Sequence, residues 1–450
     1  MRSSLLVLVS SLLLAACDSP SGSGSSNPST GDGAHFFLPT GEATNTTDPR
    51  LVVDAQGNTH AVYPRYYKGD AFYAFCGAGC KGQGDATEVV LPTHDTVTGA
   101  MITLTAEGHP RVLLADSQQV YYASCDTGCG TSAGWKVSVV VQHDGEKEVT
   151  GAGFALDHEG RPAFLLHTKV RYFHIGEREP QTELAVATGD PHEASGWSIT
   201  HVSDQNWYRP TLRFDQGGHA HVAAIIQGFK QPDGSLADQA SYLACQGDCT
   251  RPESWSGIGL VEAYASETDA VSIRESVSLA LTQDGRPRVL ALGRIDDART
   301  IDYFSCDADC TGDHWKGSII SQAAQIGDGI ELALDADDHP RFVYTLDYNI
   351  GLASCNSEHC EANDAPWNLT MVEASTQIPP DSIFLYENCN VGAWFLHSPS
   401  LALTVEGEPR VGYVARDASG GWVQDNPNGP SCPPGTDMLW TRMAVLPPVK

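Results

Sequence analysis

The sequence is poor in basic residues. Its 450 residues include 27 Lys and Arg against 56 Asp and Glu, which gives a formal net charge of -29 at pH 7. This excess of negative charge repels phosphate backbones and anionic lipid headgroups, so we expect no nucleic-acid partner. The balance suits a protein kept in solution by its surface charge, or one that binds neutral or cationic ligands.

Long apolar runs are also missing beyond the first segment. No later run reaches eighteen unbroken apolar residues, so we expect no transmembrane helix. Core-forming residues are nevertheless plentiful, because 41% of the chain is hydrophobic and only 18% is charged. The chain is longer than one average domain, and an all-β repeat that closes on itself is the architecture able to absorb that length.

The first residues have the anatomy of an export signal. Arg2 precedes an apolar run over residues 5–16, which ends Leu14-Ala15-Ala16-Cys17. This resembles the lipobox of bacterial lipoproteins, in which the Cys is acylated and becomes the mature N-terminus. The resemblance implies a signal peptide over 1–16, a membrane anchor at Cys17 and an extracytoplasmic place in the cell envelope. An ordinary signal peptide is the alternative, and the membrane and leaflet stay open.

The segment after Cys17 differs in composition from the rest of the chain. Residues 18–33 are rich in Ser, Gly and Pro, so we expect a flexible spacer over 17–34. The folded part is then expected over 35–450.

A repeat of about fifty residues runs through the rest of the chain. Each copy is an alternating apolar segment, a polar turn and a second alternating segment, which predicts a β-hairpin. The seven copies begin at Leu51, Ile102, Phe154, Leu212, Leu279, Leu332 and Leu401. Six turns share a glycine, at Gly57, Gly108, Gly160, Gly218, Gly285 and Gly407, and Asp338 takes that place in the sixth copy. Pro follows two residues later in five copies, where the first residue of a strand can do without a ladder donor.

The second half of each repeat predicts two more strands. A third strand leads to a Cys-x-x-x-Cys loop in most copies, and a Trp then opens a fourth β-rich segment, as in Trp135 and Trp315. Seven four-stranded antiparallel units in a row predict an all-β, seven-bladed β-propeller. The last repeat lacks a fourth strand, so we expect residues 35–40 to complete blade seven and remove the open edge.

The cysteines predict disulfides rather than redox or metal chemistry. Thirteen Cys minus Cys17 leaves twelve, an even number for an oxidising compartment. The expected local pairs are Cys76–Cys80, Cys125–Cys129, Cys245–Cys249, Cys306–Cys310 and Cys355–Cys360. In the third repeat, Ala187 and Pro191 stand where these two Cys would be. The remaining Cys389 and Cys432 fall in connections on one face of the propeller and are expected to pair.

Residues 35–450 resemble the sialidase-like seven-bladed propellers with BNR-type repeats. The resemblance lies in the architecture and in the Trp that closes each loop between third and fourth strands. The Ser-x-Asp-x-Gly-x-x-Trp box of that family is absent, so no catalytic residue can be carried over from it.

The expected binding face is the one that bears the connections between blades. Seven polar residues precede the innermost strands, and they diverge from copy to copy, as recognition positions do: Thr47, Thr98, Thr150, Tyr208, Glu275, Asp328 and His397. Near this ring we expect Trp207, Arg209, Arg274, Trp394 and Phe395. Aromatic, Arg and Glu side chains suit a glycan, a peptide or a partner protein. We therefore expect a binding or scaffold module without a cofactor, such as an assembly factor of the envelope; ordinary loop residues are the alternative.

Other chemistries are weaker hypotheses. Glu275, Asp328 and Glu331 could supply a carboxylate pair for glycoside hydrolysis, the alternative function on the same face. His219 and His221 have strand spacing but no evident third metal ligand. The acidic group at Asp335, Asp337 and Asp338 occupies the common turn, where turn chemistry explains it without calcium.

Overall fold

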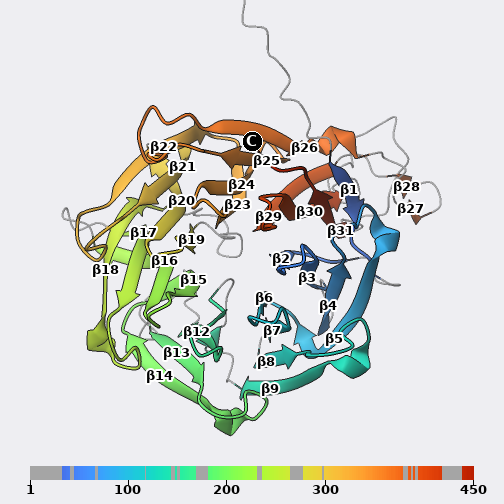
Figure 1. The fold of residues 1–450 in the computed structure, drawn as a ribbon, viewed down its shortest axis with the longest axis horizontal. Helices are drawn as coiled ribbons and strands as arrows, with labels where there is room; N and C mark the ends of the chain where they lie inside the picture. Colours follow the sequence, from blue (N-terminus) through green and yellow to red (C-terminus); the bar gives the residue numbers. More distant parts are fainter. Residues whose placement is uncertain are drawn as a thin grey trace, which may run out of the picture.

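Seven four-stranded antiparallel sheets surround a central axis in the computed structural model (Figure 1), as predicted. The described residues are 33–40, 45–65, 69–116, 118–142, 147–148, 153–168, 181–230, 236–263, 277–295, 298–378, 384–386, 389–390, 394–417 and 438–449. Cys17 and the signal segment lie outside them, as does Cys432, so its expected bond to Cys389 is outside the described part. No helix in the described part is long and apolar enough to span a membrane.

Blades are numbered here in chain order of their innermost strands. The innermost strands are β2 (Arg50–Val53), β6 (Gly99–Leu104), β11 (Ala155–Leu156), β15 (Trp207–Phe214), β19 (Val277–Leu281), β23 (Ile326–Leu334) and β29 (Trp394–Leu403). The second strands are β3 (Thr59–Pro64), β7 (Pro110–Ala115), β12 (Pro162–Thr168), β16 (Ala220–Lys230), β20 (Pro287–Ile295), β24 (Pro340–Leu346) and β30 (Pro409–Asp417). Five of these begin with Pro, as expected for a residue that cannot donate to the ladder.

The outer half of each blade follows the same order. The third strands are β4 (Gly69–Cys76), β8 (Gln119–Ser124), β13 (Thr182–Ala187), β17 (Leu236–Cys245), β21 (Ala298–Ser305), β25 (Asn349–Ser354) and β31 (Met438–Val445). The outermost strands are β5 (Ala86–Thr96), β9 (Lys136–Gln142), β14 (Trp197–Ser203), β18 (Trp255–Glu262), β22 (Lys316–Ala323), β26 (Asn368–Glu373) and β1 (Ala34–Phe37). Short extra strands are β10 (Lys147–Glu148), β27 (Phe384–Tyr386) and β28 (Cys389–Asn390). Short 3-10 turns cover Gln83–Asp85, Ser132–Gly134, Ala194–Gly196, Pro252–Ser254 and Ser375–Gln377.

The predicted turn chemistry is present between first and second strands. The recurring glycine has a left-handed backbone, with φ of 81° at Gly57 and 82° at Gly285, and Asp338 has φ of 61° in the sixth copy. Glycine adopts this conformation without steric cost, and Asp tolerates it better than most residues. The turns therefore set the hairpin register that the repeat predicted.

The disulfide loops and their Trp residues form a common unit. All five expected local disulfides are present. In four of these blades the Trp Nε1 donates to the carbonyl of the second Cys, as in Trp255 to Cys249 at 3.0 Å. In blade 3, Trp197 Nε1 donates in the same way to Pro191 O at 3.0 Å, although the disulfide is missing. Blade 1 is the converse case, because it has the Cys76–Cys80 disulfide but Ala86 in place of the Trp, so neither feature is present in every loop.

The Trp side chains also join neighbouring blades. The Trp315 ring packs on Tyr242 of the preceding blade with centroids 4.9 Å apart, and Trp135 packs on Tyr73 at 4.6 Å. Such aromatic pairs add to the burial of their faces. They help to hold adjacent sheets together around the ring.

The N-terminal strand closes the ring, as predicted. β1 pairs antiparallel with β31, with Ala34 opposite Val445 and Phe37 opposite Arg442. Figure 1 shows this blue strand beside the dark red strands from the other end of the chain. Strand pairing covers 34–37, and Leu38 N adds one hydrogen bond to Thr441 O at 2.9 Å. The paired segment is therefore shorter than the expected 35–40.

A buried ionic network lies behind this closing strand. Glu373, 4% exposed at the end of β26, accepts two hydrogen bonds from the guanidinium of Arg442 at 2.9 and 2.6 Å. It also accepts one from the Tyr413 hydroxyl at 2.6 Å. The guanidinium lies 4.3 Å from the Phe37 ring centroid of the closing strand. The network therefore links blade 6 to three strands of blade 7.

Candidate functional site: the axial mouth on the connection face

The innermost strands bend at one equivalent position near the connections between blades. In four blades, the residue three places before the recurrent apolar residue has a positive φ: Asp48 (31°), Arg209 (51°), Gly329 (96°) and Ser398 (52°). The pairing register shifts at these points in β15, β23 and β29. Bulges of this kind redirect side chains, and a left-handed residue other than Gly carries strain that often marks a functional position. The predicted ring residues Thr47, Tyr208, Asp328 and His397 come directly before these bends.

The described residues of the predicted ring differ in their contacts and burial. The Thr98 hydroxyl donates to Ala115 O at 3.3 Å, and His397 Nδ1 lies 2.9 Å from Ser398 Oγ. The Tyr208 ring contacts the His167 ring edge-on, with centroids 5.5 Å apart. Thr47 is buried, and its hydroxyl has no partner among the described residues. Thr150, Arg274 and Glu275 lie outside the described residues, as does the side chain of Asp328, so those parts of the ring stay predictions.

The two Trp residues expected near the ring are buried in the walls between blades. Trp207 is 1% exposed and packs against Trp255, with ring centroids 4.9 Å apart. Trp394 is also buried and contacts Trp440 at 5.7 Å. Trp207 and Trp394 are the first residues of their innermost strands. Because successive side chains of a strand point to opposite faces, the residues next to these two Trp, and not the Trp themselves, are directed toward the mouth. Phe395 does stay partly exposed and stacks on the Tyr348 ring at 4.3 Å.

Two charged side chains from non-adjacent blades meet on the axis, and a third lies near them. Arg50 Nη1 of blade 1 lies 3.5 Å from Glu331 Oε2 of blade 6, and both act electrostatically on Arg213 of blade 4. Blades 1, 4 and 6 approach one another only around the central channel. Arg213 is the one large side chain at its position in the innermost strands, because the equivalent residues of the other blades are Val52, Thr103, Ala155, Ala280, Ala333 and Ala402. The local sequence gives no sign that Arg50 and Arg213 share a site.

The positive groups in the channel destabilise one another. Burial lowers the pKa of Arg50, the charge of Arg209 lowers it further, and Glu331 and Asp48 oppose both effects. Burial likewise lowers the pKa of Arg213, with Arg50 adding to the shift and Glu331 opposing it. An anion placed among these guanidinium groups would relieve both the repulsion and the loss of solvation.

Arg209 is the residue best suited to contact a ligand here. Its guanidinium lies 5.4 Å from the Tyr208 ring centroid, close enough for a cation–π contact. Its Nε is buried and has no hydrogen-bond acceptor among the described residues. A buried donor without an acceptor is costly, and a carboxylate or sulfate would satisfy it with a charge-assisted hydrogen bond.

The Glu331 side chain links two neighbouring blades, a role that the sequence alone did not predict. Its Oε2 accepts a hydrogen bond from Leu401 N of the next blade at 3.0 Å. Serine hydroxyls do the same at the equivalent places, with Ser278 accepting from Leu332 N and Ser400 from Leu51 N. Of the three carboxylates predicted for hydrolysis, only the Glu331 side chain is described, and this contact holds it as a blade-to-blade link.

The two possible metal positions are explained by local hydrogen bonds. His219 Nδ1 lies 2.9 Å from Asp215 Oδ2, and His221 Nδ1 lies 2.6 Å from the Tyr242 hydroxyl. Blade 1 repeats the second contact with His60 and Tyr73 at 2.7 Å.

The other candidate, at the sixth turn, has the same explanation. Ligand atoms of Asp335, Asp337 and His339 lie within 4.8 Å of one another. The Asp335 carboxylate already accepts from two backbone N–H groups of its turn and from Arg341 Nη2 at 2.7 Å. The hydrogen bonds of the turn thus engage the Asp335 carboxylate, and the absence of a calcium site here stays a prediction.

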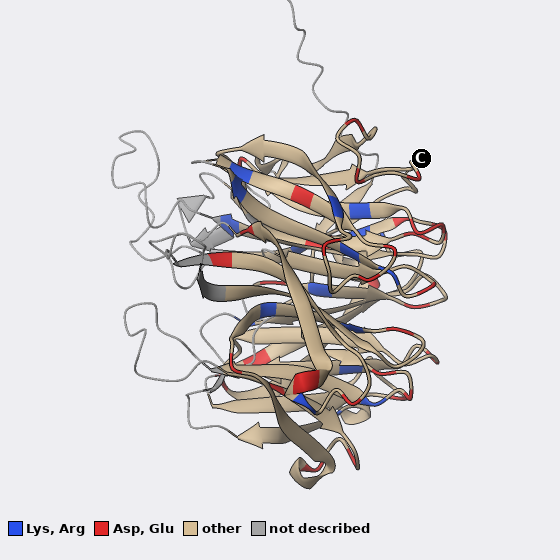
Figure 2. Ribbon diagram, turned by 90° about the vertical axis from the view of Figure 1, so that its left-hand side faces the viewer, with Lys and Arg blue, Asp and Glu red and all other residues tan. Residues whose placement is uncertain are grey.

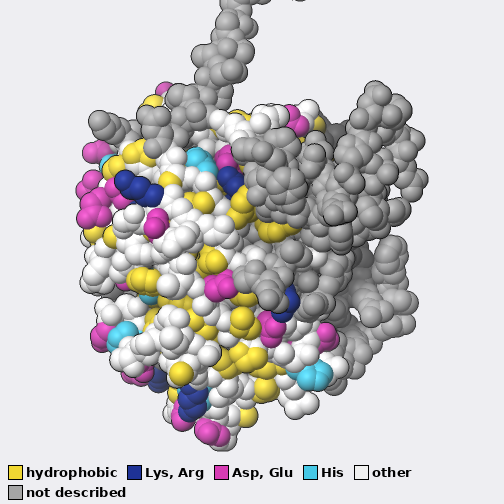
Figure 3. Space-filling view, turned by 90° about the vertical axis from the view of Figure 1, so that its right-hand side faces the viewer, with side chains coloured by type: hydrophobic (Ala, Val, Ile, Leu, Met, Phe, Trp, Pro, Cys, Tyr) yellow, Lys and Arg dark blue, Asp and Glu magenta, His cyan; other side chains and the backbone are white. Residues whose placement is uncertain are grey.

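Among the described residues, many Asp and Glu gather on the opposite face. Figure 2 shows them mostly on the short turns along its right-hand edge, and Figure 3 shows a dense group of them at its left-hand edge. The first-to-second-strand turns carry Asp54, Glu107, Asp157, Glu159, Asp215, Asp284, Asp335, Asp337, Asp338, Glu406 and Glu408. At the axial mouth, by contrast, the described charged side chains are three Arg and two carboxylates, those of Asp48 and Glu331.

The fold is a seven-bladed β-propeller, and the comparisons with known proteins show neither a family nor a function for this chain. No protein-family model and no curated protein sequence matches the chain. Among solved structures, a polysaccharide lyase is similar, with 9% identity and a TM-score of 0.48 over 91% of this chain and 92% of that one. A GH93 α-L-arabinofuranosidase of Fusarium graminearum has 11% identity and a TM-score of 0.47 over 76% and 97%. A Dyadobacter fermentans protein of unknown function has 9% identity and a TM-score of 0.43 over 92% and 98%.

These similar structures are glycan-active enzymes and an uncharacterised protein, not sialidases. The expected likeness to sialidase-like propellers is thus confirmed for the fold alone. At such low identity no residue of this chain takes a role from them.

Proposed function

We propose that the chain binds an acidic saccharide, one bearing carboxylate or sulfate groups, at the axial mouth of the connection face. The observation that carries this is the Arg209 guanidinium, which is held on a strained backbone against Tyr208 with its Nε lacking an acceptor among the described residues. Arg50 and Arg213 add positive charge deeper in the channel. An aromatic face beside a guanidinium suits a sugar ring that carries an anionic group.

Binding can be tested by calorimetric titration of oligomers of galacturonate and of a sulfated galactan, with neutral galactan as the uncharged comparison. Arg209→Gln should weaken binding of the acidic oligomers by about 10–100-fold, since one charge-assisted hydrogen bond is lost. Arg251→Gln is the matched control, because it removes the same charge from an exposed residue of a disulfide loop. Equal effects of the two variants, or equal binding of neutral galactan, would refute the proposal. Tighter binding of an acidic peptide such as poly-glutamate would assign the mouth to a peptide.

A second candidate is turnover of the same ligand. Tyr208 contacts both Arg209 and His167, and Tyr and His are groups that transfer protons in active sites. Turnover would appear as new reducing ends, or as the ultraviolet absorbance of an unsaturated product. Product formation that Tyr208→Phe abolishes, while acidic oligomers still bind, would establish an enzyme; binding without product would establish a binding protein.

The membrane attachment is part of the proposal. The lipobox-like sequence supports an envelope lipoprotein anchored through Cys17, with the 17–34 spacer between membrane and propeller. Radiolabelled palmitate should enter the wild-type protein expressed in a bacterial host and not Cys17→Ala. Label in both proteins would argue against acylation at this residue.

A further inference from the structure

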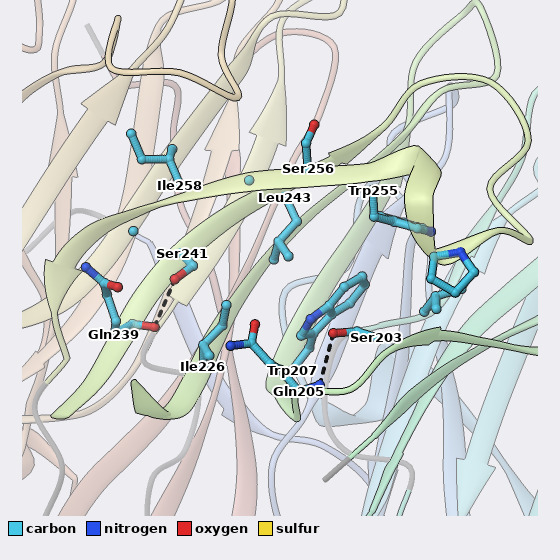
Figure 4. A pocket seen from close by; sticks show the side chains of 14 residues that line it. Ser203, Gln205, Trp207, Ile226, Gln239, Ser241, Leu243, Trp255, Ser256 and Ile258 are labelled. Carbon is cyan, nitrogen blue, oxygen red and sulfur yellow. Dashed lines mark hydrogen bonds between the residues drawn. The ribbon is translucent and has the colours of Figure 1, made fainter. Parts of the chain in front are cut away.

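A pocket of about 340 Å³ lies between blades 3 and 4, apart from the axial mouth (Figure 4). One wall comes from blade 3 and the following connection, through Val202, Ser203 and Gln205. The other wall is the face of blade 4 formed by β15 to β18. Its volume is at the lower end of the range for small-molecule sites, which suits one or two sugar rings.

The pocket exists because three small residues lie side by side in blade 4. Ala224 on β16 pairs with Ser241 on β17, which pairs with Gly259 on β18. In the other blades at least one member of the same cross-strand row has a large side chain, and beside Gly351 the Tyr344 ring fills the space. On the two outer strands the equivalent pairs are Phe72 with Val90, Tyr121 with Val139, Glu183 with His201, Asp302 with Ile319, and Gly351 with Met371.

Blade 4 also has a second glycine in its outermost strand. Gly257 precedes Gly259 by two residues, so both lie on the face that carries Trp255. In blade 5 the equivalent of Gly257 is Gly317, and the Phe304 ring fills the space beside it. In blade 4 the smaller Leu243 side chain lies beside Gly257, and the Gln239 amide lies over Gly259. The floor of the pocket is therefore bordered by Leu243, Gln239 and the Trp255 indole.

A buried donor without a partner points into this region. Trp207 is 1% exposed, and its Nε1 has no hydrogen-bond acceptor among the described residues. The Trp residues of the loops donate to a loop carbonyl, whereas Trp207 and Trp394, which both begin an innermost strand, have no acceptor for Nε1 among the described residues. Of these two, Trp207 is the one that lines the pocket. In Figure 4 the nitrogen-bearing edge of the indole is turned toward the side of the pocket where Gln205 lies. Buried donors are normally satisfied, and an orphan beside a pocket indicates a place for a ligand acceptor.

The polar groups of the pocket are neutral. None of the fourteen described residues that line it is charged. Gln205 and Gln239 bring amides, Ser203 and Ser241 bring hydroxyls, and the Trp255 ring offers an apolar face. Amides and hydroxyls that both donate and accept, beside an aromatic face, match a polyhydroxylated ring without charge.

We propose that this pocket binds a neutral sugar unit, with a sugar oxygen accepting the hydrogen bond from Trp207 Nε1. The Gln239 amide lies over Gly259, because a Cβ added to Gly259 would fall 2.0 Å from Gln239 Cδ. A small movement of the Gln239 side chain would therefore open or close the site. The site is separate from the acidic-saccharide site and does not depend on it.

The test is calorimetric titration of the protein from residue 18 to 450 with neutral disaccharides. Maltose, cellobiose, xylobiose and lactose are the ligands. Trp207→Phe keeps the ring and removes the donor, and Gly259→Val adds the side chain that blades 1 and 2 carry at this position. Each should weaken binding of the preferred disaccharide about tenfold or more. Gly84→Ala is the control for a glycine substitution, because nothing lies within 4 Å of the added Cβ.

The outcomes separate this site from the axial mouth. Arg209→Gln should leave the neutral disaccharide binding unchanged, and Trp207→Phe should leave acidic oligomer binding unchanged. Without ligand, Trp207→Phe loses the packing of part of a buried ring as well as an unsatisfied donor, so a lowered unfolding temperature would not bear on the proposal and binding is the readout. The proposal is overturned if no neutral disaccharide binds, or if both pocket variants bind as the wild type does.

Discussion

Replacing Glu373 with Gln should weaken the closure of the ring more than any single surface change. The carboxylate and the Arg442 guanidinium are 5% and 6% exposed in their side chains, and they share two hydrogen bonds. Each charge-assisted bond contributes about 1.5–3 kcal/mol, and the variant leaves a buried guanidinium without its counter-charge. Breaking such a pair costs about 3–5 kcal/mol. Tyr413 also loses a charged acceptor, so we expect the upper part of this range.

The assay is urea unfolding followed by tryptophan fluorescence and by far-ultraviolet circular dichroism, which also tests whether unfolding is one transition. Glu253→Gln is the matched control. Its carboxylate is 69% exposed beside Arg251, so a change below about 0.5 kcal/mol is expected. Superimposable unfolding curves of Glu373→Gln and the wild type would refute the reasoning that this network holds the ring closed.

Two further predictions concern stability. Burial raises the pKa of Asp302 to about 6. A raised carboxyl pKa means that its contribution to stability is present below about pH 4 and is lost as the pH rises through 6. Asp302→Asn should therefore stabilise the fold by up to about 3 kcal/mol at pH 8 and little at pH 4; an equal gain in urea midpoint at both pH values would contradict this. Changing Cys125 and Cys129 together to Ala should cost roughly 2 kcal/mol, because the loop is short. Trp135→Ala, in the same loop, should cost about 3 kcal/mol, and the reverse order of these two losses in urea unfolding would show that the disulfide is the stronger element of the loop.

The blades could be predicted from the sequence because their signals are local. Alternation of apolar residues, a glycine or Asp338 in the turn and Pro at the start of the second strand all act within one hairpin. The N-terminal strand could be predicted as well, since a blade with three strands leaves an edge that something must cover. The local Cys pairs followed from their spacing, and Pro191 kept its place in the loop without a disulfide.

The candidate sites could be predicted only in part. The ring positions emerge from the repeat, and backbone bends follow directly after two of them, at Arg209 and Ser398. The approach of Arg50, Arg213 and Glu331 to one another depends on three distant blades that reach one axis, and no local pattern contains it. The pocket of blade 4 likewise depends on Gly259 and its neighbours on two other strands. Side-chain alternation also placed Trp207 in a wall rather than at the mouth.

The most direct test of the account is a crystal structure of the propeller with a galacturonate oligomer. The account predicts an oligomer at the axial mouth, with a carboxylate about 3 Å from the guanidinium of Arg209 and a sugar ring near Tyr208. An oligomer bound on the acidic turn face, or an axial mouth that stays without saccharide at saturating concentration, would contradict it.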